Sequence, residues 1–237
     1  MEFGNIRDIA VGHPEEWKHK LFLTFDFDWA CDEVLTAAIQ MVENADVPAT
    51  WFVTHETPLL GRLRENPKFE LGIHPNFNYL LNNDVRNGRN SEEVVDTLLS
   101  IVPETKSIRS HSVTQNAQLL QMFVGKGITH DCNHFIPEQS GIELKPWSLW
   151  DRLVKVPYFW EDDVVCQDSE RTPMKVLAQR NGLKVFDFHP IHVFLNTDNL
   201  QRYEQTREIH KNPIELAKYR CKGEGIRTAL EEILAMG

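Results

Sequence analysis

Short apolar runs rich in β-branched and aromatic residues recur along the chain, and segments with helical periodicity lie between them. Seven runs have the length of buried strands: LFLTFDF from Leu21, ATWFV from Ala49, FELGI from Phe69, SIRSH from Ser107, ITHDC from Ile128, LVKVPYF from Leu153 and LKVFDFH from Leu183. Apolar residues three and four positions apart predict helices over 32–43, 91–102, 114–124 and 172–180, and an amphipathic closing helix over 225–236.

This alternation is typical of βα units that build a parallel sheet. About seven strands fit a barrel better than a short doubly wound sheet, so the expected fold class is α/β, a distorted (β/α) barrel with about seven parallel strands. A single domain over residues 1–237 is the simplest organisation for this length. In such a barrel, the chemistry lies at the carboxyl ends of the strands.

Residues 75–90 are rich in asparagine and short of apolar periodicity, which predicts a long loop after the third strand. Loops of that length in compact domains are usually functional or mobile. Ser91, followed by Glu92 and Glu93, is predicted to be a helix N-cap with acidic residues in the first turn.

The composition, with 41% hydrophobic and 25% charged residues, is that of an ordinary globular protein. A net charge of −10 argues against nucleic acid or an anionic membrane as partner, because both require clustered Lys and Arg. No apolar run reaches the roughly 20 residues of a membrane span and the first residues lack an apolar signal segment, so we expect a cytoplasmic protein. The four cysteines form no CxxC pair and are expected to be buried thiols.

Two carboxylates close the first predicted strand. Asp26 and Asp28 are two residues apart, which places both side chains on the same face of the strand. The like charges repel each other unless a cation is present, and a divalent metal would let one carboxylate act as ligand and the other as base. An ordinary pair of turn or capping aspartates is the alternative.

His74 ends the third predicted strand, and Asn78 follows four residues later. This spacing is compatible with two metal ligands on one turn. A lone core histidine is the alternative, and an amide is a weaker zinc ligand than histidine, cysteine or carboxylate.

Two further strand ends carry polar groups. Arg109 would lower the pKa of nearby carboxylates and orient them, and a main-chain amide near Ser112 would meet an oxyanion. In the last predicted strand, Asp187, His189 and His192 offer a general acid, and we favour His189. A plain salt bridge and structural histidines are the alternatives.

An aromatic stretch precedes three acidic residues: Trp147, Trp150, Tyr158, Phe159 and Trp160, then Glu161, Asp162 and Asp163. Aromatic rings are good platforms for the faces of sugars, although most aromatic rings belong to a core.

The first two of these segments resemble motifs of the polysaccharide deacetylase family, also called the NodB-homology group or carbohydrate esterase family four. TFDFD at 24–28 resembles the first motif, which implies that Asp26 is the catalytic base and that Asp28 binds the metal. His74 with Asn78 resembles the second motif, in which two histidines four apart complete the metal triad.

The later segments follow in the family's order, so the match runs from about Leu21 to Asn196. RSHS from Arg109 resembles the third motif, where the arginine holds the base, and KVPYFWEDD resembles the fourth loosely. His189 resembles the catalytic-acid histidine of the fifth. The whole set is most similar to the deacetylases of bacterial O-antigen biosynthesis.

Two positions depart from the family pattern. Asn78 stands where the family has its second histidine, which implies weaker metal binding and less selectivity for zinc. His111 and Ser112 stand where many members have a proline and an aromatic residue, so the resemblance does not define the side chains of this wall of the substrate groove.

The resemblance implies a metal-dependent hydrolase that removes N-acetyl groups from amino sugars of a bacterial surface polysaccharide, or of its precursor. The expected cofactor is a divalent metal, zinc before cobalt, nickel or manganese, held by Asp28, His74 and Asn78. The expected partner is a carbohydrate, with substrate contacts at His111, His192 and Trp160.

The implied mechanism divides the remaining work among four residues. Asp26, oriented by Arg109, takes the proton of the attacking water, and His189 protonates the departing amine. The main-chain amide of Ser112 shares the oxyanion with the metal.

Two other functions stay open at this point. A catalytically silent glycan-binding relative on the same fold is compatible with Asn78. A magnesium-dependent phosphohydrolase would use the DxD pair, but that design usually has Thr or Val where Ala30 stands. It would also leave His74, Arg109 and His189 without a role.

Overall fold

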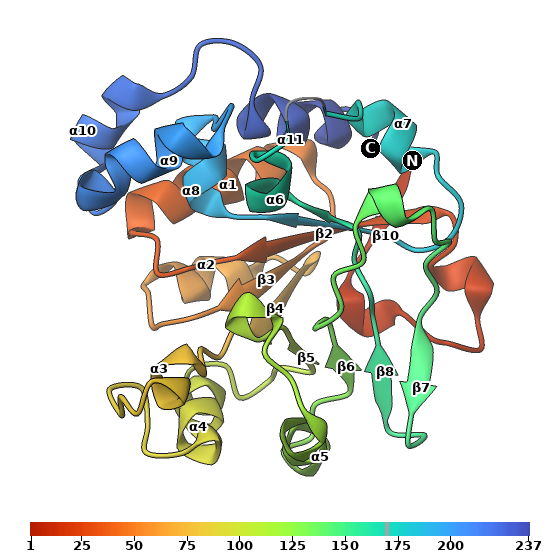
Figure 1. Ribbon diagram of the computed structural model, residues 1–237. Coiled ribbons are helices and arrows are strands. Elements are labelled where there is room, and N and C mark those ends of the chain that lie inside the picture. The colour runs from red at the N-terminus through yellow and green to blue at the C-terminus, as the bar shows by residue number, and fades with distance from the viewer. Residues whose placement is uncertain (169–170) are drawn as a thin grey trace.

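The computed structural model describes residues 1–168 and 171–237, and it places ten strands in one curled sheet (Figure 1). The strand order is β7-β8-β6-β5-β4-β3-β2-β10-β9, with β1 paired to β2 off this path. All pairings are parallel except that of β7 with β8. Within the described residues no pairing joins β7 to β9, so the barrel is open. The predicted fold class is confirmed, with more strands than the seven expected.

Seven of the strands coincide with the predicted apolar runs: β2 (Lys20–Asp26), β3 (Ala49–Val53), β4 (Phe69–Ile73), β5 (Ser107–Ile108), β6 (His130–Asp131), β8 (Leu153–Lys155) and β10 (Lys184–Phe188). The other three were not predicted: β1 (Glu2–Gly4), β7 (Trp147–Leu149) and β9 (Trp160–Glu161). Strands of two or three residues are too short to show a period in sequence.

Strand β2 lies at the centre of the sheet. β10 pairs with Leu21–Phe25 along one edge of β2. Along the other edge, β1 pairs with Lys20–Phe22 and β3 pairs with Thr24–Asp26. All its residues after Lys20 are buried, which explains why its sequence is a nearly continuous apolar run.

The predicted helices are present with small shifts of their ends: α1 (Asp32–Ala45), α4 (Ser91–Ile101), α5 (Ala117–Gly125), α7 (Met174–Ala178) and α11 (Ile226–Leu234). Several short helices were not predicted: α2 (Leu59–Glu65), α3 (Asn78–Leu81), α6 (Asp162–Val165), α8 (Pro190–Leu195), α9 (Leu200–Thr206) and α10 (Pro213–Leu216). With one or two turns each, they offer too few apolar positions for a helical period.

The predicted N-cap at Ser91 is wrong by one residue. The cap of α4 is Asn90, whose side-chain oxygen accepts a hydrogen bond from the backbone N–H of Glu93 at 2.9 Å. Ser91 is the first helical residue. The segment 75–90 is a loop as expected, interrupted by the single turn of α3.

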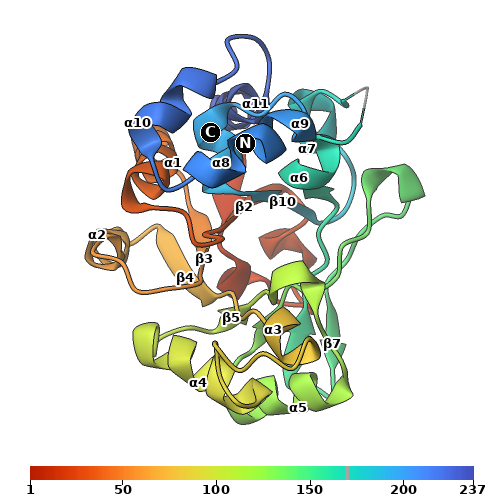
Figure 2. The same cartoon turned by 60° about the vertical axis from the view of Figure 1, so that its left-hand side comes forward.

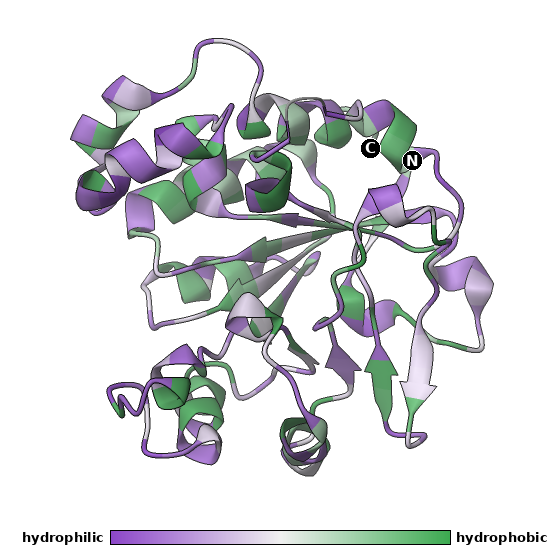
Figure 3. Cartoon of the chain, in the orientation of Figure 1, coloured by the Kyte–Doolittle hydropathy of each residue, from purple (hydrophilic) through white to green (hydrophobic). Residues whose placement is uncertain are grey.

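Helices α1, α8 and α11 pack against one another over the part of the sheet that contains β2 and β10 (Figures 1 and 2). Hydrophobic residues concentrate on the strands and on the helix faces that meet them, and hydrophilic residues lie mainly along the outer turns (Figure 3). In the part of the chain that the structure describes, no helix has the length and apolar character needed to cross a membrane.

Candidate active site

Polar side chains from four parallel strands converge at one edge of the sheet. β2, β4, β5 and β10 run parallel, so the residues that follow their carboxyl ends come together. They line a cavity of about 150 Å³. Its walls include most of the predicted site residues: Asp26, Asp28, His74, Arg109, His111, Ser112 and His189.

Three potential metal-ligand atoms form a nearly equilateral triangle in this cavity. Asp28 Oδ1 lies 3.1 Å from His74 Nε2 and 3.3 Å from His111 Nδ1, and the two ring nitrogens are 3.3 Å apart. Tetrahedral zinc, with bonds of about 2.0–2.1 Å, requires its ligand atoms to lie about 3.3 Å apart. Asp28 Oδ1 is also buried without a hydrogen-bond partner. The carboxylate and two imidazoles therefore fit a zinc ion in both spacing and chemistry.

Asn78, the expected third ligand, lies outside this triangle. Its side-chain N–H donates to Ser112 Oγ at 3.0 Å, and its backbone N–H is held by Asn76 Oδ1 at 2.9 Å. The third corner of the triangle is His111 Nδ1. His111 follows β5, whereas Asn78 belongs to the segment after β4. Sequence reasoning assigned His111 to the substrate and did not consider it as a metal ligand.

Asp28 reaches the cavity through a turn rather than through strand alternation. β2 ends at Asp26, and both Asp28 and Trp29 have left-handed backbone conformations, with φ of 44° and 56°. Such conformations are uncommon for residues other than glycine and are typical of functional sites. The turn directs the Asp28 carboxylate back toward His74. Burial acts to raise the pKa of Asp28, but the neighbouring imidazoles of His111 and His74 outweigh it and hold that pKa well below its usual range.

The Asp26 carboxylate is 3% exposed and is engaged on both oxygens. Oδ1 accepts a hydrogen bond from Arg109 Nη1 at 3.0 Å, and Oδ2 lies 3.3 Å from His74 Nδ1. The Arg109 guanidinium lies between the rings of Phe52 and Tyr158, with its central carbon 4.7 Å and 4.4 Å from their centroids. Arg109 is itself 1% exposed, so its ion pair with Asp26 is buried.

Asp187 is a second buried partner of Arg109. Its Oδ1 accepts hydrogen bonds from Arg109 Nη1 and, at 2.9 Å, from Thr24 Oγ1. Burial raises the pKa of Asp187 well above its ordinary value, against the opposing effect of the guanidinium. One arginine therefore serves two buried carboxylates, of which only Asp26 lines the cavity.

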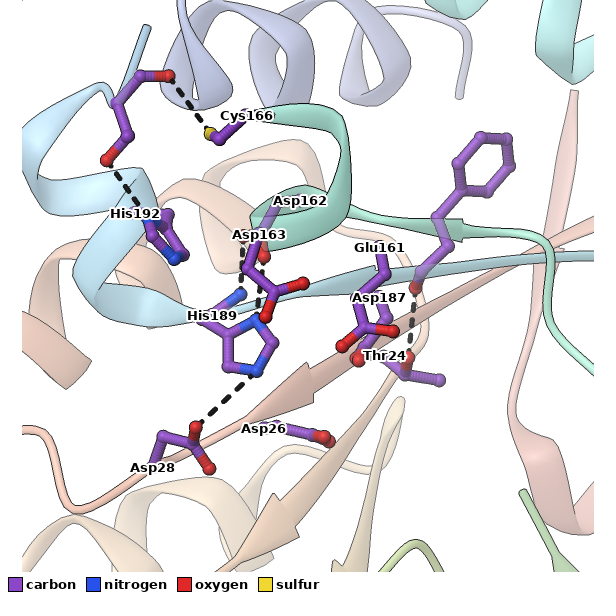
Figure 4. A network of polar contacts seen from close by, with 12 residues as sticks. Thr24, Asp26, Asp28, Glu161, Asp162, Asp163, Cys166, Asp187, His189 and His192 are labelled. Atoms are coloured by element: carbon purple, nitrogen blue, oxygen red, sulfur yellow. Dashed lines mark hydrogen bonds and ion pairs between the residues drawn. The ribbon is translucent and has the colours of Figure 1, made fainter. Parts of the chain in front are cut away.

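His189 lies beside Asp28 and is held by Asp162 (Figure 4). Its Nδ1 is 2.7 Å from Asp162 Oδ1, and its Nε2 is 3.6 Å from Asp28 Oδ2. Burial lowers the pKa of His189, but the charge and hydrogen bond of Asp162 outweigh it and raise that pKa well above the ordinary value. His189 Nε2 faces the cavity. Sequence reasoning named Asp162 only as part of an acidic run and did not pair it with His189.

Two predicted substrate contacts lie away from this cavity. His192 is 3% exposed and packs behind His189, its Nδ1 3.0 Å from Thr197 Oγ1, and burial lowers its pKa to about 3. The ring of Trp160 packs against Phe188 at 4.7 Å between centroids, and Trp160 lines a different cavity.

The comparisons with known proteins identify the family of this chain. A family model described as WbmS-like polysaccharide deacetylase matches residues 23–207. A solved structure from Bordetella bronchiseptica, of a candidate polysaccharide deacetylase involved in O-antigen biosynthesis (WbmS), is 46% identical, with a TM-score of 0.91 over 99% of this chain and 98% of that chain.

A more distant structure shares the fold. A candidate polysaccharide deacetylase from Mycobacterium smegmatis is 16% identical, with a TM-score of 0.51 over 92% of this chain and 91% of that chain. The comparison with curated proteins gives no match. The family match covers well over half of the chain, and this protein therefore belongs to the WbmS-like polysaccharide deacetylase family.

Proposed function

We propose that this protein is a metal-dependent N-deacetylase, which hydrolyses the N-acetyl group of an amino sugar in a bacterial surface polysaccharide or its precursor. The observation that carries the proposal is the triangle of Asp28, His74 and His111, with a buried carboxylate and a histidine–aspartate pair beside it. The similarity to the WbmS protein of O-antigen biosynthesis supports the substrate class.

Asp28, His74 and His111 would hold the metal, with zinc favoured by two imidazoles and one carboxylate at tetrahedral spacing. When bound, a divalent cation polarises the acyl oxygen and lowers the pKa of water. Cobalt, nickel and manganese are the alternatives, because ligand sets of this kind do not discriminate strongly among them.

The chain's own residues then move the protons. Asp26, fixed by Arg109, accepts the proton of the water that attacks the acyl carbon. His189 donates its Nε2 proton to the nitrogen as the carbon–nitrogen bond breaks, so that acetate and a free amine leave. The backbone N–H of Ser112, a residue of the cavity wall, would donate to the developing oxyanion.

The test is acetate release from a panel of N-acetylated amino sugars by the zinc-loaded protein. Asp26→Asn should lose at least about 100-fold in kcat/KM, the usual contribution of a general base. Asp46→Asn, a change at an exposed aspartate paired with Lys68, is the control and should retain full activity. Full activity of Asp26→Asn would refute the mechanism. A protein that binds sugar but takes up no metal when zinc is supplied would be a silent glycan-binding relative.

A further inference from the structure

The turn that carries His111 has a strained backbone. It follows β5 and contains the short 3-10 helix His111–Val113. Ser112 and Val113 both have left-handed backbone conformations, with φ of 56° and 46°. Such a conformation is an outlier for a β-branched residue such as valine, and it persists only where the surroundings hold it. The turn therefore needs contacts outside itself to keep the His111 ring at the third corner of the ligand triangle.

A buried polar cluster lies on the two adjacent strands, β6 and β8 (Figure 1). This anchor cluster consists of Asp131, Asn133 and Lys155, which are 0%, 1% and 1% exposed. Parallel pairing places Asp131 between Ile108, the last residue of β5, and Lys155. Lys155 Nζ donates to Asp131 Oδ1 at 2.7 Å. Asp131 also accepts hydrogen bonds from Asn133, from its backbone N–H at 2.9 Å and from its side-chain N–H at 3.3 Å. The ion pair thus orients the Asn133 side chain.

The anchor cluster binds the turn at both of its ends. On the side before His111, Asn133 Oδ1 accepts a hydrogen bond from the backbone N–H of Ser110 at 2.7 Å. On the side after it, the Gln115 side chain accepts a hydrogen bond from Lys155 Nζ at 3.0 Å and donates one to the Asn133 carbonyl oxygen. The strained residues therefore lie between two points that are fixed to the same buried groups.

The anchor cluster takes no direct part in the chemistry of the site. None of its members is among the described residues that line the catalytic cavity. A buried ion pair is seldom more stabilising than apolar residues of the same volume, so stability alone does not account for Asp131 and Lys155. Groups that orient metal ligands, by contrast, typically change metal affinity or activity 10–100-fold. This contrast favours a role in orienting His111.

We propose that the anchor cluster positions the metal site, because through Ser110 and Gln115 it holds the turn in the conformation that brings His111 Nδ1 to Asp28 and His74. Its members are positioning residues that act through the backbone of the turn. The inference deepens the proposed function and rests on it for the metal and the reaction. The hold on the turn can be measured in the metal-free chain, and zinc binding can be measured without catalysis.

The test is Asn133→Ala in the full chain, with two readouts that do not involve activity. Zinc affinity, measured by competition with a chromogenic chelator, should fall at least about tenfold. In the metal-free protein, the backbone amides of residues 110–115 should exchange with deuterium at least about tenfold faster, while those of β2 keep their rates. Gln115→Ala, a milder change at a half-buried position that leaves the ion pair intact, should shift both readouts in the same direction.

Asn196→Ala is the matched control. Asn196 is also a buried asparagine, 4% exposed, and its side chain makes four hydrogen bonds to the backbone around the start of α11. Its replacement should lower the free energy of unfolding in urea at least as much as Asn133→Ala does. Zinc affinity and the exchange of residues 110–115 should nevertheless change less than about twofold, because these hydrogen bonds do not reach the turn.

Three results would overturn the inference. The first is unchanged exchange of residues 110–115 in both Asn133→Ala and Gln115→Ala. The second is unchanged zinc affinity in both variants, and the third is an equal loss of zinc affinity in Asn196→Ala. A protein that takes up no zinc would overturn this inference together with the proposed function. Zinc affinity that falls only in the two anchor variants, in a protein that releases no acetate from any sugar of the panel, would support the inference and refute the proposed reaction.

Discussion

Asp162 holds His189 with both of its carboxylate oxygens. Oδ1 lies 2.7 Å from His189 Nδ1, and Oδ2 accepts a hydrogen bond from the backbone N–H of His189, also at 2.7 Å. The ring is therefore fixed with Nε2 toward the cavity, and the negative charge of Asp162 is the main reason why the pKa of His189 is raised. The orientation and the charge of the proposed acid depend on one residue.

Asp162→Asn should move the alkaline limb of the kcat/KM profile to lower pH. The acid works only while His189 is protonated, so activity falls as the pH rises through its pKa, and removal of the Asp162 charge lowers that pKa. At alkaline pH, kcat/KM of Asp162→Asn should be lower than that of the unchanged protein by about 100-fold, and the difference should be smaller at pH 6. Asp46→Asn, at an exposed aspartate paired with Lys68, should leave the limb in place. An unchanged limb in Asp162→Asn would contradict this role.

His111→Ala should weaken zinc binding at least 100-fold, measured by competition with a chromogenic chelator. This exceeds the roughly 10–100-fold cost of losing a group that only supports a ligand. Asn78→Ala removes a hydrogen bond to Ser112 and should change zinc affinity less than threefold, by roughly the effect of a surface contact. If the two variants lose zinc affinity equally, Asn78 is a metal ligand after all.

Arg109→Met should lower the free energy of unfolding by about 3–5 kcal/mol at pH 8, because it leaves Asp26 and Asp187 buried without a cation. The difference in the free energy of unfolding between Arg109→Met and the unchanged protein should be smaller at pH 5. Burial already raises the pKa of Asp187, and without the guanidinium it rises further, so protonation stabilises the variant as the pH falls. Urea denaturation at the two pH values measures this.

The control for that experiment is Arg64→Met. Arg64 pairs with Glu104 at 2.6 Å, but both side chains are more than 40% exposed, so the loss should stay below about 1 kcal/mol. A deficit of Arg109→Met that grows between pH 8 and pH 5 would refute the assignment of the cost to buried carboxylates.

Gly72→Ala should destabilise the fold by about 1–3 kcal/mol, the usual cost of an overpacked core. A Cβ at this position in β4 would lie 2.5 Å from a ring carbon of Phe52 and 3.1 Å from the Ser107 carbonyl oxygen. Phe52 also packs on Arg109, so activity should fall with stability. Gly61→Ala in α2 meets no atom within 4 Å and should be neutral or stabilising in thermal unfolding. A stable, fully active Gly72→Ala protein would contradict the packing described.

The convergence of the site was predictable because it follows from topology. Asp26, His74, Arg109 and His189 each lie at or just after the carboxyl end of a predicted parallel strand, and such ends share one edge of a sheet. The strands themselves were visible as apolar runs because both faces of the sheet are covered. These inferences needed only the order of elements along the chain.

The positions of Asn78 and His111 were not predictable in the same way, since they depend on the paths of two loops. The loop after β4 holds the Asn78 side chain against Ser112, and the short helical turn after β5 brings His111 to Asp28. The burial of His192 and Trp160 likewise depends on how α8 and β9 are packed. Spacing in sequence does not determine these three-dimensional paths.

The position of His111 matters for how members of this family are sorted into active and inactive proteins. A criterion that asks for two histidines four residues apart after the third predicted strand would class this chain as a degenerate enzyme. A criterion based on the spatial triangle would not, because the same corner can be supplied from the end of the adjacent strand. Ligand loss at one position is therefore informative only when the neighbouring strand ends are inspected for a replacement.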